Sequence, residues 1–253
     1  MESLNQNSQG QVRVARRKLS VGLARSTDEI LEAQRLRYRV FAGEMGARLT
    51  TRIAGVDQDI YDPWCEHLVV RDDAVGEIVG TYRILSPVNA SRIGYYSETE
   101  FDLTRLQHLR PRLVEAGRSC VHPDYRDGTT IALLWAGLAR YMRENGYIYL
   151  MGCASIGMSD GGHAAASLYR RLGDHMGPVE YRVFPRCPLP LDLLRQHDEV
   201  EAPPLIKGYL RAGAWICGDP AWDPDFNTAD LPVLLLMSKV EGRYAKRFMG
   251  QKD

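Results

Sequence analysis

The chain has 253 residues, of which 45% are hydrophobic and 25% charged, so it is long enough to bury a large core in one domain or two small ones. Lysine plus arginine and aspartate plus glutamate each number 32, and this balance gives no electrostatic reason to expect a nucleic-acid partner. The five cysteines are scattered and include no Cys-x-x-Cys pair, which favours reduced thiols. The sequence shows neither the apolar region of a secretory signal peptide nor a run of ~20 apolar residues, and we therefore expect a cytoplasmic globular protein.

The first part of the chain predicts a disordered tail followed by a strand, a helix and two further strands. Residues 1–17 are polar and then basic. Ser26 and Thr27 are good helix N-caps, and acidic residues follow them in the first turn. The short sequence DAVG between two apolar runs suits a hairpin turn. The predicted elements are a strand over 19–24, a helix over 26–46, an irregular segment over 47–63, and strands over 66–73 and 77–87.

The second part predicts alternating strands and helices. Residues 129–146 are amphipathic and end at an Asn-Gly pair, whereas residues 147–157 are almost continuously apolar, as in a strand covered on both faces. The predicted elements are a short element near 100–106, strands over 112–122, 147–157 and 179–185, helices over 129–146 and 161–173, and a helix, a strand, a proline-rich loop and a last strand within 189–253. This order predicts a mixed α/β sheet covered by helices.

The stretch VEAGRSCVHPDYRDG, residues 114–128, carries charge through an otherwise apolar strand. Glu115 and Arg118 interleave with apolar or small residues, so either the strand is half exposed or the charged positions line a cleft. The strand then passes into a helix through a loop that contains Arg126, Gly128 and Thr129. Free backbone amides at the start of a helix can bind a phosphate. An equal alternative is that this loop is only a tight turn in which a threonine caps the helix.

Several motifs in this order resemble known acyltransferases. VHPDYR, a glycine, a helix and an apolar strand followed by ASLYRRLG resemble the acyl-donor core of the Gcn5-related N-acetyltransferase fold. LRYRVFAGEMG, DIYDPW, GTYRIL and EAGRSCV resemble the acyl-homoserine-lactone synthases, and more closely the ornithine lipid synthases, which are ornithine N-acyltransferases. The C-terminal PPLIKGYLRAGAWICGDPAWDPDFNTADLPVLLL is similar to the second group. The resemblance covers roughly residues 19–248.

The resemblance implies the fold and its division along the chain. We expect an α/β fold with a mixed, mostly antiparallel sheet, whose splayed central strands hold the pantetheine arm of the donor and whose faces are flanked by helices. Residues 18–253 would form a single acyltransferase domain after the polar tail 1–17. Within it, residues 18–186 would be the acyl-donor core, and residues 187–253 an extension that completes the sheet and the acceptor pocket.

Glu115 is the candidate catalytic base. Aminolysis of a thioester needs a neutral amine, and a positioned carboxylate that takes the proton typically contributes about 10²–10⁴ in rate. A backbone N–H at an irregular point of the strand, near Cys120–His122, would donate to the developing oxyanion. A thioester is already activated, so no covalent intermediate is needed and Cys120 is expected in the core. The alternative is that Glu115 is an ordinary surface residue without a functional role.

The resemblance also implies positions that bind or orient the substrates. Asp59 and Asp62 could instead be turn residues beside Pro63. A set of arginines and acids on different elements could order the loop over the cleft or hold the zwitterionic head of an amino acid. The histidines show no metal-ligand spacing, and we expect no metal. The implied positions are Arg37, Phe41, Asp59, Asp62, Arg83 and Arg118 for the substrate, and Val121, Arg126, Gly128 and Thr129 for the phosphopantetheine.

The resemblance implies transfer of a (3-hydroxy)fatty acyl chain from acyl carrier protein to the α-amine of ornithine, giving lyso-ornithine lipid. Glutamine or lysine as acceptor, a lactone-type signal synthase using S-adenosylmethionine, and a non-catalytic binding module are the alternatives. No cofactor would be bound permanently, because the phosphopantetheine arm of the carrier brings the acyl group.

Two basic segments are candidate contact surfaces. Residues 105–112 suit docking of the acidic carrier protein, although they could equally be solvated charges. The segment KVEGRYAKRFMG, residues 239–250, suits peripheral contact with the inner membrane.

Overall fold

The computed structural model describes residues 17–195 and 200–240. The predicted tail, apart from its last residue, and all but two residues of the basic segment 239–250 lie outside this range. Within the described residues, no helix combines the length and the apolar character that crossing a membrane requires.

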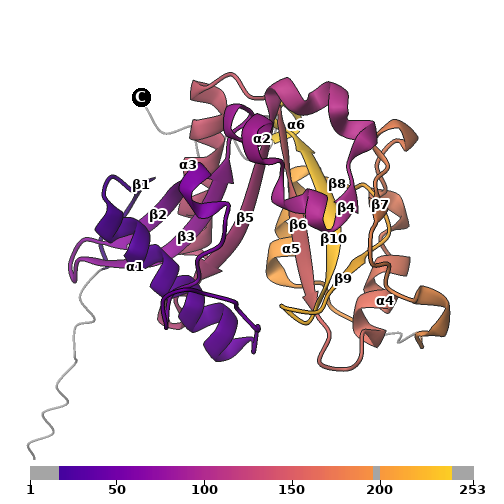
Figure 1. Cartoon of the computed structure of the whole chain (residues 1–253), viewed down its shortest axis with the longest axis horizontal. Helices are drawn as coiled ribbons and strands as arrows, with labels where there is room; N and C mark the ends of the chain where they lie inside the picture. The colour runs from indigo at the N-terminus through magenta and orange to yellow at the C-terminus, as the bar shows by residue number, and fades with distance from the viewer. Residues whose placement is uncertain (1–16, 196–199, 241–253) are drawn as a thin grey trace, which may run out of the picture.

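A sheet of eight strands runs through the molecule (Figure 1). Its order is β1-β2-β3-β5-β6-β10-β8, with β9 also paired to β10. Every neighbouring pair is antiparallel except β5 and β6, so the sheet is mixed and mostly antiparallel, as expected. The strands are β1 (Leu19–Leu23), β2 (Glu66–Asp72), β3 (Glu77–Leu85), β5 (Leu113–Val121), β6 (Tyr149–Gly157), β8 (Trp215–Ile216), β9 (Ala221–Asp223) and β10 (Thr228–Leu236).

The parallel pair β5 and β6 stays together over one end only. Leu113–Glu115 pairs with Tyr149–Met151, and beyond these residues the two strands diverge (Figure 1). β10 follows β6 along its whole length, from Thr228 opposite Gly157 to Leu236 opposite Tyr149. The divergence confirms the expected splayed central strands, and β6, with β10 paired along its other edge, forms the far side of the opening.

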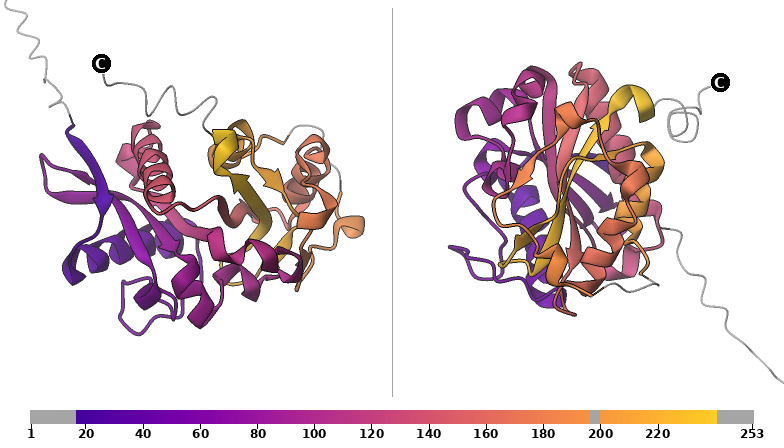
Figure 2. Two further views of the ribbon diagram at one scale, coloured as in Figure 1. Left: turned by 90° about the horizontal axis from the view of Figure 1, so that it is seen from above. Right: turned by 90° about the vertical axis from the view of Figure 1, so that its right-hand side faces the viewer.

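Helices cover both faces of the sheet. α1 and α3 lie on opposite faces of the β1–β2–β3–β5 half, as the view from above shows (Figure 2). Ser26 caps α1 by accepting a hydrogen bond from the Glu29 amide, and a π-helical turn, Arg39–Glu44, continues α1 toward the opening. The helices are α1 (Thr27–Tyr38), α2 (Pro87–Ile93), α3 (Thr129–Glu144), α4 (His163–Arg170), α5 (Pro204–Ala212) and α6 (Met237–Val240).

Two local expectations were wrong. Residues 179–185 were expected to form a strand, but Val179–Tyr181 form a 3-10 turn and only Phe184–Pro185 form a strand, β7, which pairs with β4 (Phe101–Asp102). Their apolar residues do not mark a buried face, because Val179 is 72% exposed and Phe184 is 55% exposed. The end of the segment 77–87 was expected to be strand, but Ser86 caps α2 and Pro87 starts it.

Candidate active site

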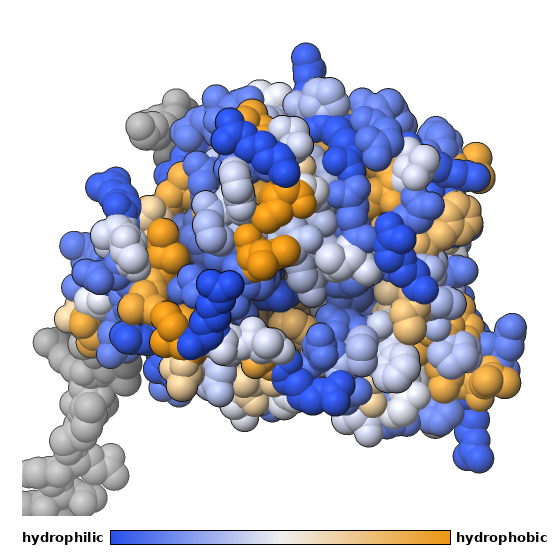
Figure 3. All heavy atoms as spheres, in the orientation of Figure 1, coloured by the Kyte–Doolittle hydropathy of each residue, from blue (hydrophilic) through white to orange (hydrophobic). Residues whose placement is uncertain are grey.

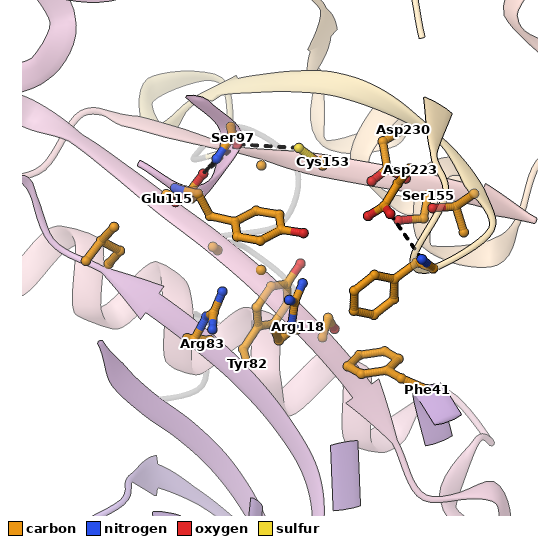
Figure 4. Close-up of a pocket in the computed structure, with 18 of the residues that line it drawn as sticks. Phe41, Tyr82, Arg83, Ser97, Glu115, Arg118, Cys153, Ser155, Asp223 and Asp230 are labelled. Atoms are coloured by element: carbon orange, nitrogen blue, oxygen red, sulfur yellow. Dashed lines mark hydrogen bonds between the residues drawn. The ribbon is translucent and has the colours of Figure 1, made fainter. Parts of the chain in front are cut away.

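A pocket lies where β5 and β6 part. Glu115–Ser119 of β5 line one wall, and Gly152, Cys153 and Ser155 of β6 line the other. Phe41 closes the pocket from the π-helical turn, and Phe226 packs edge-on against it with ring centroids 5.6 Å apart. The face of the molecule drawn in Figure 1 is hollowed near its middle (Figure 3), and Figure 4 shows the side chains around the pocket. The position predicted for Phe41, beside the substrates, therefore lies on the pocket wall.

Gly152 marks the point at which the two strands separate. It follows Met151, the last residue of β6 paired with β5. A Cβ atom at this position would lie 2.4 Å from the carbonyl oxygen of Ala116, closer than real side chains approach. The close approach of the two backbones therefore requires glycine here.

Glu115 is buried in the pocket wall and held by three hydrogen bonds. Its Oε2 accepts from the Tyr96 amide at 2.7 Å, and its Oε1 accepts from the amide of Ser97 at 2.7 Å and from the Ser97 hydroxyl at 2.5 Å (Figure 4). Burial raises the pKa of Glu115 above its usual range, while the three donors oppose the rise. The result is a carboxylate that is fixed in orientation and more basic than an exposed one. Glu115 is thus not a surface residue.

The irregular point of β5 lies at Arg118. Thr81 pairs with Cys120 and Arg83 with Gly117, so two residues of β5, Arg118 and Ser119, stand opposite one residue of β3. Arg118 takes a positive φ of 52°, as the extra residue of a β-bulge often does. The expected irregularity near Cys120–His122 was placed too late, because the amide of His122 donates to the carbonyl of Val79 in a regular ladder.

Three arginines and three aspartates form a closed ring of ion pairs beside the pocket. Each aspartate contacts two arginines, and each arginine contacts two aspartates, so the charges of the ring balance. The ring joins α1, β3 and β5 to the irregular loop between α1 and β2. Its pairs are Arg37–Asp57 (2.7 Å), Asp57–Arg118 (3.5 Å), Arg118–Asp59 (3.2 Å), Asp59–Arg83 (2.6 Å), Arg83–Asp62 (3.1 Å) and Asp62–Arg37 (2.9 Å).

The ring explains how its carboxylates stay charged inside the protein. Burial alone would raise the pKa of Asp62, but Arg37 and Arg83 outweigh it and hold the pKa well below its usual range. The sequence pointed to five of the six members and missed Asp57. The spacing Asp-x-Asp-x-x-Asp in GVDQDIYDPW was the available signal. Of the three arginines, Arg118 makes the longest contacts, and both Arg118 and Arg83 line the pocket.

The loop residues predicted to bind phosphopantetheine lie beyond the far end of the pocket-lining part of β5, and none of Val121, Arg126, Gly128 and Thr129 lines the pocket itself. Gly128 caps α3 with a positive φ of 94°, and Arg126 donates to the carbonyl of Val121 and pairs with Glu44 at 2.8 Å. The Thr129 amide donates to Asp127. One amide of this helix start is therefore already occupied.

A second group of acids, which sequence reasoning missed, lies on the β6–β10 side of the pocket. Asp223 and Asp230 line the pocket, and Glu100 is close to Asp230. Glu100, Cys153 and Asp230 place their potential ligand atoms within 4.8 Å of one another, the geometry that a metal ion would need. No sequence spacing signals this group, because Glu100 is far in sequence from the β9 and β10 strands that carry the two aspartates.

Known proteins match the chain over most of its length. Residues 36–136 match the model of an acetyltransferase (GNAT) domain. The chain is 39% identical over 245 residues to the L-ornithine N(alpha)-acyltransferase of Brucella abortus, covering 89% of this chain and 87% of that protein. It is 38% identical over 254 residues to the L-ornithine N(alpha)-acyltransferase of Agrobacterium fabrum, covering 93% of this chain and 86% of that protein.

Solved structures share the fold at low sequence identity. A CoA-dependent acyl-homoserine lactone synthase, BjaI, superposes with a TM-score of 0.55 at 15% identity, over 89% of this chain and 84% of that one. FeeM, an N-acyl amino acid synthase from uncultured soil microbes, superposes with a TM-score of 0.52 at 13% identity, over 92% of this chain and all of that one. The fold is that of the GNAT acyltransferases, and the identity and coverage of the relatives show that the chain belongs to the L-ornithine N(alpha)-acyltransferase family.

Proposed function

We propose that this protein transfers a fatty acyl group from a thioester to the α-amine of ornithine. The names of its relatives support ornithine as the acceptor. The observation that carries the chemistry is Glu115, a buried and firmly held carboxylate at the point where the two central strands open into a pocket. Such a group can accept the proton of an attacking amine inside a site that also admits the thioester.

The reaction follows from these positions. Glu115 removes a proton from the α-ammonium, directly or through one water, and the free amine attacks the thioester carbon. A C–N bond forms, the C–S bond breaks, and the thiol leaves with a proton. Negative charge develops on the carbonyl oxygen, and we assign its hydrogen-bond donor to a backbone amide at the bulge Arg118–Ser119, where the register of the ladder shifts.

Arg118 is the residue that we assign to the α-carboxylate of the acceptor. Its guanidinium lies over the rings of Tyr96 and Phe226, with its carbon 4.7 Å and 4.5 Å from their centroids. Arg37 and Arg83, by contrast, are held by the shortest pairs of the ring and are almost fully buried. Arg37, Arg83, Asp59 and Asp62 therefore act in this account by fixing Arg118 and the loop above the pocket.

The acyl donor in this proposal is the phosphopantetheine arm of an acyl carrier protein, carrying a 3-hydroxyacyl chain. The arm would enter between β5 and β6, with its phosphate near Arg126, Gly128 and Thr129. Tyr82 and Tyr209, whose hydroxyls hydrogen-bond to each other, line the main pocket next to apolar residues of β6 and β10, and we assign the start of the acyl chain to this side. A cytoplasmic location, docking of the carrier on residues 105–112 and inner-membrane contact through residues 239–250 stay predictions.

Thiol release tests the proposal. The purified protein is given 3-hydroxyacyl carrier protein with ornithine, lysine, glutamine or S-adenosylmethionine as separate acceptors, and the products are identified by mass. Release driven by ornithine, with an N-acylornithine product, supports the proposal. Release with another amino acid keeps the chemistry and changes the acceptor, and release with S-adenosylmethionine alone replaces the proposal with a lactone-type synthase.

A further inference from the structure

Asp223 and Asp230 line the β6–β10 side of the pocket and Glu100 lies close to Asp230, and within the described residues none of the three forms an ion pair. Figure 4 shows Asp223 and Asp230 beside Ser155, across the pocket from Glu115. Asp230 lies opposite Ser155 in the β10–β6 ladder and opposite Ala221 in the β10–β9 ladder, so the sheet brings it to this wall. Glu100 comes from the turn that follows Ser97. We call Glu100, Asp223 and Asp230 the acid cluster.

Three of the six carboxylate oxygens of the acid cluster accept no hydrogen bond of good geometry within the described residues. Glu100 is 9% exposed and Asp230 is 4% exposed. These three oxygens are both oxygens of Glu100 and Oδ1 of Asp230, and the side chains that face them, apart from the acids themselves, are uncharged ones, Cys153 for Glu100 and Ser155 and Thr228 for Asp230. Asp223 uses one oxygen to hold the turn at Asp225 and Phe226. Buried polar atoms are rarely left without a strong partner, so these oxygens indicate a ligand that carries hydrogen-bond donors.

The acid cluster contrasts with the ring on the other side of the pocket. In the ring every aspartate contacts two arginines. In the acid cluster, no lysine, arginine or histidine among residues 17–195 and 200–240 forms an ion pair with any of the three acids. The chain thus balances three buried acids with its own cations and leaves three others for a cation that it does not supply.

Burial and the proximity of the acids to one another favour the protonated forms of Glu100 and Asp230. Burial, followed by the charge of Asp230, raises the pKa of Glu100 well above its usual range. Burial, followed by the charge of Asp223, raises the pKa of Asp230 as well. An incoming cation would favour the ionised carboxylates and make charge-assisted hydrogen bonds with them.

We propose that the acid cluster binds the ammonium group at the end of the acceptor's side chain and thereby selects a diamino acid. This inference rests on the proposed function, because it assigns the second amine of an acceptor whose first amine is acylated. Glutamine carries no charge at this position and would leave the acids unpaired. A buried site built for a charged group rejects an analogue that lacks it, because the site's polar atoms then have no partner.

The acid cluster and the proposed base lie on one path of contacts. The Ser97 hydroxyl contacts Glu115 at 2.5 Å and the sulfur of Cys153 at 3.4 Å. That sulfur is in turn within 4.8 Å of the Glu100 and Asp230 carboxylates. A substrate with two amines joined by a short aliphatic chain could place one amine at Glu115 and the other at the acid cluster. Ornithine, with three methylene groups between its α-carbon and its terminal amine, has this shape.

A comparison of ornithine with norvaline tests the proposal, because norvaline has hydrogen in place of ornithine's terminal amine. The ratio of kcat/KM for ornithine to that for norvaline is measured in the wild-type protein and in Asp230→Asn and Glu100→Gln. We expect the ratio to fall by about 10- to 100-fold in each variant, the usual effect of losing a hydrogen bond to a charged group. Asp219→Asn, an exposed acid outside the pocket bonded to Tyr169, is the matched control and should leave the ratio unchanged.

A binding measurement without turnover accompanies the kinetics. Ornithine should raise the Tm of the wild-type protein, and this shift should be lost in Asp230→Asn, whose Tm without ligand stays the same or rises because a buried repulsion is removed. An equal loss of activity with ornithine and norvaline in Asp230→Asn would overturn the proposal. A Tm shift produced by Zn²⁺ or Mn²⁺ and lost in the same variant would overturn it in favour of a metal site.

The design separates this inference from the proposed function. One outcome is that the wild-type protein acylates ornithine while the ratio of kcat/KM for ornithine to that for norvaline does not change in the variants. In that case the acid cluster does not bind the side-chain ammonium group, and the proposed function stands. If no acceptor releases thiol, the proposed function fails. In that case an ornithine-dependent Tm shift that requires Asp230 still supports the acid cluster as a diamino-acid site, and its absence rejects both.

Discussion

Ser97 donates two hydrogen bonds to one oxygen of Glu115, from its amide at 2.7 Å and from its hydroxyl at 2.5 Å. The two residues belong to different elements, the turn before β4 and the strand β5. Because Tyr96 donates to the other oxygen at 2.7 Å, the carboxylate cannot rotate without losing a bond. The turn thus sets the orientation of the group that we propose as the base.

Replacing Glu115 by glutamine should lower kcat by about 10²–10⁴, the usual contribution of a general base. Donor binding should change little, because the amide keeps the size of the side chain. Steady-state kinetics with ornithine and a titration with carrier protein measure the two quantities. Glu180→Gln, at an exposed position, is the control. Near-normal turnover in Glu115→Gln would remove this residue from the mechanism.

Ser97→Ala should move the acidic limb of the pH–rate profile to higher pH. In this account, the acidic limb reports the ionisation of Glu115. Burial raises the pKa of Glu115, and the Ser97 hydroxyl opposes this rise because it stabilises the ionised form. Without the hydroxyl, the pKa of Glu115 rises further, and activity is lost at a pH where the wild-type protein still works. Ser91→Ala, which removes an exposed hydroxyl bonded to the Val88 carbonyl, should leave the limb in place. A shift to lower pH contradicts the assignment of the limb to Glu115.

Asp62→Asn should destabilise the fold by about 3–5 kcal/mol at neutral pH, because Arg37 and Arg83 lose their shared buried partner. The pKa of Asp62 is lowered in the folded state, so the stability it contributes is present above its unfolded pKa of about 3.9 and is lost as the pH falls toward the folded value. Urea unfolding at pH 7 and at about pH 3 measures the difference, which should shrink at the lower pH.

The control for Asp62→Asn is Asp28→Asn, an exposed position in the first turn of α1. It should cost no more than about 1 kcal/mol. Equal effects of the two substitutions, or a loss for Asp62→Asn that does not depend on pH, would show that the ring does not stabilise the fold through its charges.

Gly152→Ala should cost about 1–3 kcal/mol, because its Cβ would meet the Ala116 carbonyl at 2.4 Å. The clash would widen the separation of β5 and β6 near Glu115 and lower kcat as well. Gly157→Ala lies on the same strand with nothing within 4 Å of its Cβ, so it should be neutral in both measurements. If Gly152→Ala matches Gly157→Ala in thermal unfolding, the close approach of the strands is not a constraint.

Arg126→Ala should raise KM for the acyl donor by about tenfold and leave kcat nearly unchanged, as expected for loss of one contact to a phosphate. Arg140→Ala, an exposed arginine of α3 bonded to the Val21 carbonyl, is the control. An unchanged donor KM in Arg126→Ala would place the phosphate elsewhere, which the occupied amide of Thr129 makes a real alternative.

The sequence predicted best where a local pattern specifies the structure. The charged positions of 114–122 marked the cleft, and the repeated arginines and acids marked the ring. Prediction failed where apolar residues lie on the surface, as at Val179 and Phe184. The acid cluster was not predicted, because Glu100 is far in sequence from Asp223 and Asp230 and meets Asp230 only in the folded structure.

The most direct test of the account is a single turnover with ornithine carrying nitrogen-15 at the α-amine only, followed by NMR of the product. In our proposals we assign the α-amine to Glu115 and the terminal amine to the acid cluster. We predict that the new amide contains nitrogen-15 in the wild-type protein and that the product is almost absent in Glu115→Gln. An amide at the unlabelled terminal nitrogen, or release of free fatty acid without an amide, would contradict the account.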